Sequence, residues 1–484
     1  MGECSTKERS KNVSKTVKNS KDYQNMQSKP VLRKFSVEDK FTSLKKISKG
    51  GFGQVFLYQD KVSPYTKYAA KKMKKDFKDS SEMQYNLREI NNLRQMDHPN
   101  IVNYLGTYED KNHIYLIMEY VPGITLKDLI SGKKSKKLSE NDIKVFFKTL
   151  ISAVSYIHNK GIIHRDIKPN NILLSNKNDL SSLKLIDFGL SINKDDTDPF
   201  RVGCPLFMSP EIINGEFCSQ SDLWSIGVIL YYMVTGHYPF SGDTKGEIFK
   251  KIQAGDYSKD ALENSWCSKE LKDLIKRILK VDLRERITVK ECLKHPFLKD
   301  DSQKTDLKLD SDIVNSIKDF INKNTFQKEI SYLIGRIVPD CEISRLRKLF
   351  VSLDQSNSGE ISYGNFLTVL KSLGYSLSDD NSFKLFERLD FHKRGAVSYS
   401  EFVAAALSST IEEDKLCKVF HYLDPYCTGY IMGNSIINAL KERHIMIDQS
   451  SLNKMNFCCK YDFFEFKEMF FASANEQSIS KSIQ

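Results

Sequence analysis

Two carboxylates and one amide lie close together in the middle of the chain, in a pattern that suits phosphoryl transfer. Asp166 and Asn171 belong to Ile163-His164-Arg165-Asp166-Ile167-Lys168-Pro169-Asn170-Asn171, and Asp187 follows in Asp187-Phe188-Gly189. Carboxylate and amide oxygens are hard ligands that suit Mg²⁺, so Asn171 and Asp187 would hold the metal that bridges nucleotide phosphates. Asp166 would accept the proton of an attacking hydroxyl, and Lys168 would steady the transferring phosphate.

Three upstream segments supply what such chemistry needs on the nucleotide side. Gly50, Gly51 and Gly53, in Ile47-Ser48-Lys49-Gly50-Gly51-Phe52-Gly53-Gln54-Val55, let backbone amides approach phosphates, although a plain hairpin explains them equally well. Lys71 ends the strand-like Tyr68-Ala69-Ala70-Lys71 and would clamp the α- and β-phosphates. Glu89, in the helical stretch Leu87-Arg88-Glu89-Ile90, would orient that lysine.

These motifs, in this order, resemble a eukaryotic protein kinase over residues 41–298. Lys168 after His164-Arg165-Asp166 resembles the serine/threonine class, and Ser209-Pro210-Glu211 resembles the close of an activation segment, with Arg286 as the partner of Glu211. The resemblance implies ATP and Mg²⁺ as cofactors, protein substrates, and Asp166, Lys168, Lys71 and Glu89 as catalytic residues. It implies that the nucleotide is bound by Ile47, Gly50, Gly51, Gly53, Val55, Ala69, Lys71, Met118, Glu119, Val121 and Leu173.

Two features of the activation segment depart from that pattern. Cys204 stands where many kinases carry a threonine that touches the catalytic aspartate, and a thiol is a weaker donor than a hydroxyl. Thr197 is surrounded by Asp195, Asp196 and Asp198, which leaves three interpretations open: it receives an activating phosphate, the acids replace one, or the segment is a solvated loop. A pseudokinase is the alternative, but Lys71, Asp166, Asn171 and Asp187, whose loss usually marks one, are all present.

An internal repeat follows, in which Asp354, Asp390 and Asp424 open three loops that resemble EF-hands. Loop one (354–365) ends in Asn365, where a calcium loop needs a bidentate glutamate. Loop two (390–401) keeps that glutamate, but His392 and Arg394 occupy ligand positions three and five, and arginine has no lone pair to donate. Ca²⁺ binding is therefore expected to be weak or absent, with these candidate ligands: Asp354, Ser356, Ser358, Glu360, Asp390 and Glu401.

The whole arrangement resembles the calcium-dependent protein kinases. We predict an α+β bilobal protein kinase fold followed by an all-α, calmodulin-like EF-hand domain. The predicted order is a disordered basic segment (1–40), the kinase domain (41–298), a linker with a junction helix (299–338), two EF-hand pairs (339–408 and 409–475) and a tail (476–484). In that family the junction blocks the substrate cleft until Ca²⁺-loaded EF-hands remove it. Intramolecular contacts between kinase, junction and EF-hands are therefore expected, and a helix packed permanently on either part is the alternative.

Composition and the N-terminus bear on location. The 484 residues are 40% hydrophobic and carry a net charge of +11, with ten cysteines in no CxxC pair, as expected of a cytoplasmic globular protein. Met1-Gly2-Glu3-Cys4-Ser5-Thr6 matches an acylation signal on Gly2, with Cys4 as a second lipid site. A basic tail follows, which favours an anionic membrane over nucleic acid, for which no motif exists. For the N-terminus, the alternative is an unmodified tail. For the whole chain, the alternative to an active kinase is a membrane-tethered scaffold with vestigial catalysis.

Overall fold

The computed structural model describes residues 33–34, 37–50, 53–63, 65–75, 80–131, 138–196, 203–299, 311–372, 378–442 and 459–472. Four predicted site residues, Gly2, Cys4, Gly51 and Thr197, lie outside these ranges. Among the described residues, no helix combines the length and the hydropathy that crossing a bilayer requires.

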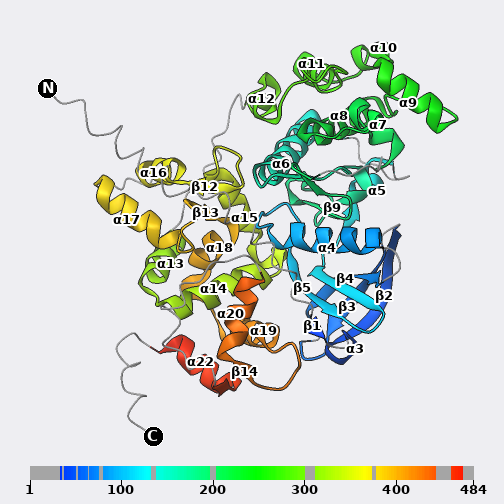
Figure 1. Ribbon diagram of the computed structural model, residues 1–484. Coiled ribbons are helices and arrows are strands. Elements are labelled where there is room, and N and C mark those ends of the chain that lie inside the picture. Colours follow the sequence, from blue (N-terminus) through cyan, green and yellow to red (C-terminus); the bar gives the residue numbers. More distant parts are fainter. Residues whose placement is uncertain are drawn as a thin grey trace, which may run out of the picture.

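The N-terminal lobe is built on a six-stranded sheet in the order β1-β5-β6-β4-β3-β2. Its strands are β1 (Arg33–Lys34), β2 (Phe41–Gly50), β3 (Gly53–Asp60), β4 (Lys67–Lys74), β5 (Tyr104–Glu109) and β6 (His113–Glu119). The helix α4 (Ser80–Arg94) lies beside the sheet (Figure 1). Its Ile90 and Leu93 are buried in the same apolar core as Met73 of β4. This packing fixes α4 against β4.

The C-terminal lobe is mainly helical, with α6 (Glu140–Asn159) and α8 (Ser219–Thr235) at its centre. Every residue of α8 from Ser221 to Tyr231 is buried, as expected of an apolar helix inside a lobe. Shorter helices surround them: α5 (Leu126–Ser131), α7 (Pro210–Asn214), α9 (Lys245–Ala254), α10 (Lys259–Glu263), α11 (Lys269–Ile278) and α12 (Val289–Cys292). Small strands β7 (Ile124–Thr125), β9 (Ile172–Leu174) and β10 (Leu183–Leu185) form a sheet beneath the cleft, and β8 (Ile162–Ile163) pairs with β11 (Ile192–Asn193).

The described residues between 311 and 472 form a separate helical region with its own apolar core. Its first two helices are α13 (Ser311–Asn322) and α14 (Thr325–Ile337). The first EF-hand-like pair follows and consists of α15 (Asp340–Leu353), α16 (Tyr363–Ser372), α17 (Asp379–Leu389) and α18 (Tyr399–Leu407). The second pair has α19 (Glu413–Leu423), α20 (Gly433–Lys441) and α22 (Phe463–Phe471). Short strands β12 (Glu360–Ser362) and β13 (Ala396–Ser398), and β14 (Ile431–Met432) and β15 (Lys460–Tyr461), join the loops in pairs.

Two segments differ from the sequence-based expectation. The junction is two helices, because the Asn324 side chain accepts from the Gln327 amide in a capping box that starts a new helix. Part of the segment predicted to be disordered is structured: Arg33–Lys34 forms β1, parallel to β5, and Val37–Lys40 forms α3. The reason is contact with the helical region, since Arg33 forms a buried ion pair with Glu442.

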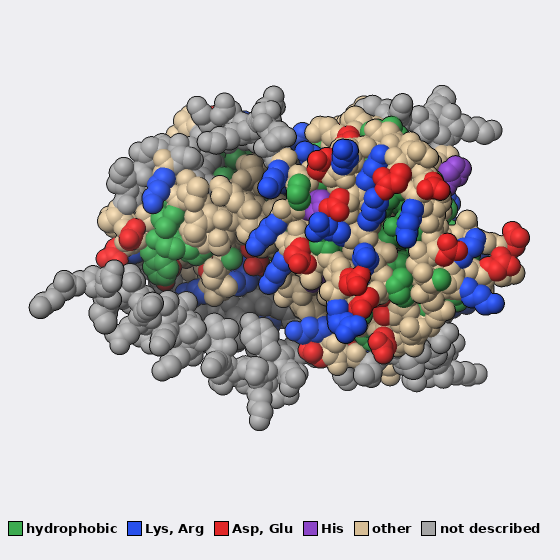
Figure 2. Space-filling model, turned by 90° about the horizontal axis from the view of Figure 1, so that it is seen from above, with side chains coloured by type: hydrophobic (Ala, Val, Ile, Leu, Met, Phe, Trp, Pro, Cys, Tyr) green, Lys and Arg blue, Asp and Glu red, His purple; other side chains and the backbone are tan. Residues whose placement is uncertain are grey.

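The helical region lies beside both lobes (Figure 1). Seen from above, acidic and basic side chains are interspersed over the half of the molecule that holds the C-terminal lobe, rather than gathered by sign (Figure 2). The positive net charge is therefore not concentrated in one basic patch on this face.

Candidate active site

The nucleotide-side residues are brought together by strand register. Gly50 of β2 faces Gly53 of β3, Val55 faces Lys71 of β4, and Ala69 faces Met118 of β6. Gly53 has a φ of +145°, and a Cβ there would lie 2.7 Å from the Lys72 carbonyl oxygen, so only glycine fits this hairpin. Ile47 lies on β2, Glu119 ends β6 before Val121, and Leu173 lies on β9.

Lys71 is clamped between two carboxylates. Its Nζ lies 2.7 and 2.8 Å from the two oxygens of Glu89 on α4, and 2.8 Å from Asp187 Oδ1. Burial lowers the pKa of Lys71, but the two carboxylates raise it by more, so that the amine stays charged. The same amine holds the pKa of Asp187 below its ordinary value against the effect of burial. The contacts of Lys71 with Glu89 and Asp187 bring α4 and the Asp187-Phe188-Gly189 segment into one site.

Asp166 is held by its neighbours in the catalytic segment. Lys168 Nζ lies 2.6 Å from Asp166 Oδ2, and Asn171 Nδ2 donates to the same oxygen at 2.8 Å. The segment is anchored from below, because the backbone amides of His164 and Arg165 donate to the Asp222 carboxylate at 2.9 and 2.8 Å. The short range of these contacts fixes Asp166 close to Lys168 and Asn171.

The donor set fits Mg²⁺. Asn171 uses its amide hydrogens on Asp166, which leaves its amide oxygen available as a ligand. The Asp187 side chain is 38% exposed although its Oδ1 pairs with Lys71, so its carboxylate is open to solvent on one side. One amide and one carboxylate oxygen, with phosphate oxygens and water, are the ligands that Mg²⁺ prefers.

The end of the activation segment is also fixed. Glu211 accepts from Arg286 at 2.7 and 3.0 Å and from the Ser221 hydroxyl at 2.8 Å. Cys204 is partly buried and packs against the core of the C-terminal lobe. The predicted pairing of Glu211 with Arg286 is therefore present in the structure.

The comparisons with known proteins agree with this geometry. Residues 41–298 match the protein kinase domain family, and residues 343–407 match the family of EF-hand domain pairs. Calcium-dependent protein kinase 34 of Arabidopsis thaliana is 32% identical, over 84% of this chain and 78% of that protein. Calcium-dependent protein kinase 3 of Plasmodium berghei is 32% identical, over 87% of this chain and 78% of that protein.

The chain belongs to the calcium-dependent protein kinase family. The predicted family, fold class and serine/threonine kinase activity with ATP and Mg²⁺ are confirmed, and the scaffold alternative is not favoured. The predicted site residues that the structure describes fall into three groups: the nucleotide-side and catalytic residues, the activation-segment residues Cys204 and Glu211, and the residues of the EF-hand loops.

In the EF-hand loops, the first aspartate of each loop is occupied by donors of its own turn. Asp354 Oδ2 accepts from the Gly359 amide at 2.6 Å, and its Oδ1 accepts from the hydroxyls of Ser356 and Ser358 at 2.8 and 3.2 Å. The Glu360 side chain pairs instead with Lys160 of the kinase domain at 3.0 Å. Loop one therefore offers one carboxylate, which fits Ca²⁺ poorly.

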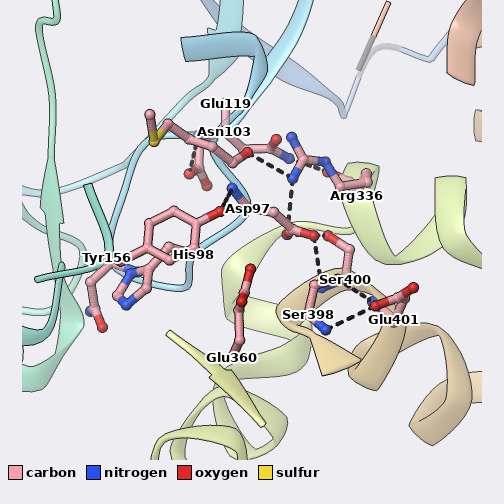
Figure 3. Close-up of polar contacts among 12 residues, drawn as sticks. Asp97, His98, Asn103, Glu119, Tyr156, Arg336, Glu360, Ser398, Ser400 and Glu401 are labelled. Carbon is pink, nitrogen blue, oxygen red and sulfur yellow. Dashed lines mark hydrogen bonds and ion pairs between the residues drawn. The ribbon is translucent and has the colours of Figure 1, made fainter. Parts of the chain in front are cut away.

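Sequence reasoning missed one group of residues, at the contact between the kinase domain and the helical region (Figure 3). Asp97, which follows α4, lies 2.9 Å from Arg336 Nη1 of α14 and accepts from the Ser400 hydroxyl of α18 at 2.6 Å. Burial raises the pKa of Asp97, but Arg336 and the hydroxyl donors lower it by more, to about 2. Each of these residues is a charged or polar residue near a helix end, and no local sequence pattern indicates that the three lie together.

Gly359 of loop one completes this contact. A Cβ at Gly359 would lie 2.5 Å from His98 Cδ2 and 2.7 Å from Tyr156 Cδ2, so the loop backbone rests directly on the kinase domain. On the other side, Arg33 and Arg94 of the N-terminal lobe contact Glu442. In the part of the chain that the structure describes, no hydrogen bond or ion pair joins the helical region to Asp166, Lys168 or Asp187.

Proposed function

We propose that this chain transfers the γ-phosphate of ATP to serine or threonine hydroxyls of protein substrates, with Asp166, Lys168, Lys71, Asn171 and Asp187 as the working residues. The observation that supports this assignment is two clusters of side chains in mutual contact. Lys71 pairs with Glu89 and Asp187, and Asp166 contacts Lys168 and Asn171. Bound Mg²⁺ would neutralise phosphate charge, with Asn171 and Asp187 as its protein ligands.

The roles of the chain's own residues follow from their contacts. Glu89 holds the Lys71 amine in place, so that the amine is oriented before nucleotide binds. Asp166 orients the substrate hydroxyl and accepts its proton, while the adjacent Lys168 amine supplies positive charge where the phosphoryl group passes. Alignment and charge neutralisation of this kind make up most of the catalysis in phosphoryl transfer.

The test is phosphate transfer to a mixed-peptide substrate, followed by identification of the modified residues by mass spectrometry. The full chain should label serine and threonine, and Asp187→Ala should abolish labelling. Asp282→Ala, at an exposed carboxylate of the C-terminal lobe, is the matched control and should retain activity. A full chain that labels no better than Asp187→Ala would refute the assignment.

The helical region is proposed to regulate this activity through its contacts with the kinase domain. Asp97, Arg336 and Ser400 connect the two parts, on a surface that leaves Asp166 and Asp187 uncovered by ion pairs or hydrogen bonds from the described helical region. The described arrangement is thus one in which α13 and α14 pack on the EF-hand-like helices and α14 also contacts the kinase domain.

The N-terminus is proposed as a membrane anchor. The support is the sequence alone: Gly2 in an acylation motif, Cys4 beside it and a basic tail, which together provide the two signals that stable attachment needs. Flotation of the full chain with anionic vesicles, after expression in cells that acylate proteins, tests it. Gly2→Ala should leave the chain unbound, and equal flotation of both proteins would rule out the anchor.

A further inference from the structure

Loop two holds two cations of its own where an EF-hand holds Ca²⁺. The bidentate position, Glu401, receives the Arg394 guanidinium at 2.8 Å on Oε2, and His392 Nδ1 lies 2.9 Å from its Oε1. The other imidazole nitrogen of His392 lies 3.2 Å from Glu329 of α14. One glutamate that would bind the metal is therefore already paired with two side chains from the same loop.

The exposed fractions of these side chains distinguish a buried cation from a partly exposed one. The side chains of His392 and Glu401 are 4% and 0% exposed, whereas the Arg394 side chain is 32% exposed and its pair is partly screened by water. Each ring nitrogen of His392 faces a carboxylate oxygen, which can only accept a proton or a hydrogen bond, so the ring carries a proton on both nitrogens and is a cation. His392 is the inner cation and Arg394 the outer one.

Ca²⁺ does not fit this arrangement. Arg394 stands at ligand position five and has no lone pair to offer, and its guanidinium uses the oxygen that the ion would need. In the described part of the chain, no group of three or more histidine, cysteine, aspartate and glutamate side chains is arranged to hold a metal. The loop nevertheless keeps its turn, since the Arg394 and Gly395 amides donate to Asp390 at 2.8 and 2.7 Å.

The cation pair is joined to the kinase domain through two helices. Glu401 stands next to Ser400, whose hydroxyl donates to Asp97, so the first turn of α18 meets both the loop and the kinase domain (Figure 3). Glu329, the partner of His392, lies on α14, the helix that carries Arg336 to Asp97. At Gly335 a Cβ would lie 2.9 Å from the Ser400 carbonyl oxygen, so α14 and α18 are in backbone contact.

We propose that His392 and Arg394 replace Ca²⁺ as the cations of loop two, and that they hold α14 and α18 in the arrangement that docks on Asp97 without any metal. The helical region would then stay docked through this loop at every Ca²⁺ concentration. This inference rests on the proposed function only for its regulatory meaning, because docking and metal binding are measured without catalysis.

The test restores the metal ligands. The double variant His392→Asp/Arg394→Asn gives loop two side-chain oxygens at positions three and five and leaves Asp390 and Glu401 in place. By calorimetry, the full-length variant should bind one more Ca²⁺ per chain than the parent, with a Kd of roughly 10⁻⁷–10⁻⁵ M as in sensor loops. Lys393→Asn, which removes an exposed cation from the same loop, is the matched control and should bind no more Ca²⁺ than the parent.

Hydrogen exchange of peptides covering residues 96–103 and 399–407 reports docking. With chelator, the double variant should exchange there about tenfold faster or more, a loss of roughly 1.4 kcal/mol, and Ca²⁺ should restore the parent's rates. The parent and Lys393→Asn should be equally protected with chelator.

Two results would overturn the proposal. One is a double variant that gains no Ca²⁺ equivalent over the parent, and the other is parent-like exchange of that variant in chelator. If the variant does not fold in chelator, the single variant Arg394→Asn, at the partly exposed cation, decides in its place: it should exchange faster than Lys393→Asn, and equal rates would refute the role of Arg394. A parent without kinase activity would instead refute the proposed function and leave these results unchanged.

Discussion

Replacing Arg336 should separate the helical region from the kinase domain more than any other single change at this contact. Its Nη1 lies 2.9 Å from Asp97 Oδ1 and donates to the Met96 carbonyl oxygen at 3.0 Å, and the two charged side chains are 3% and 6% exposed. Arg336→Met keeps the length of the side chain but leaves a buried carboxylate without its cation. Removal of one partner from a buried pair costs about 3–5 kcal/mol. The Ser400 hydroxyl still donates to Asp97, so we expect the lower end, about 3 kcal/mol.

The assay is hydrogen exchange of the full chain in the peptides that cover residues 96–103 and 399–407. A loss of about 3 kcal/mol corresponds to exchange roughly 100-fold faster, provided that exchange requires separation of the two parts. The double variant Asp97→Asn/Arg336→Met should recover much of the protection, because it leaves no buried charge unpaired. Arg284→Met, at an exposed arginine paired with Asp282, is the matched control and should exchange like the parent. Exchange of Arg336→Met within threefold of the parent would contradict the reasoning.

Three further predictions follow from individual contacts. Glu89→Gln should lower kcat about 100-fold in steady-state assays, because Lys71 loses the carboxylate that positions it; an unchanged kcat would argue against that role. The Asp97 carboxyl has a pKa of about 2 in the folded chain against 3.8, so its stabilisation is complete above about pH 4 and is lost as the pH falls from 4 to 2; urea unfolding across this range measures it, and a flat profile would contradict it. Gly359→Ala should destabilise docking by about 1–3 kcal/mol, because its Cβ would lie 2.5 Å from His98. Gly395→Ala is the control, since Gly395 has a similar positive φ but no atom within 4 Å of the added Cβ, so this variant carries only the backbone cost. Equal effects of the two variants on hydrogen exchange would refute the contact at Gly359.

The sequence predicted the kinase fold and family because its informative residues act over short distances. Asp166, Lys168 and Asn171 contact one another within one segment, so their spacing alone indicates their chemistry. Strand register then places Lys71, and the helix that follows carries Glu89 to it. The predicted roles of individual site residues remain predictions, to be tested by the variants above.

The contact between the two parts could not be predicted in the same way. Asp97, Arg336 and Ser400 come from segments far apart in the sequence and meet only where the kinase domain and the helical region are in contact, and no local pattern indicates that contact. The split of the junction was a different case, because Asn324 and Gln327 form a capping box that the sequence displays. The apolar periodicity continues across that box, and for this reason the pattern predicts a single junction helix within residues 299–338.

The three loops described in full show why the internal cations occur where they do. In each, the first aspartate accepts from the amide of the glycine at position six, so the turn needs no metal to form. The last position differs: loops one and three end in Asn365 and Ser435, which are neutral, and only loop two keeps a buried glutamate, Glu401. A buried carboxylate without a cation is costly, so a loop that does without Ca²⁺ must either lose the glutamate or gain a positive charge. Loops one and three have no glutamate at this position, whereas loop two keeps the glutamate and pairs it with the positive charges of His392 and Arg394.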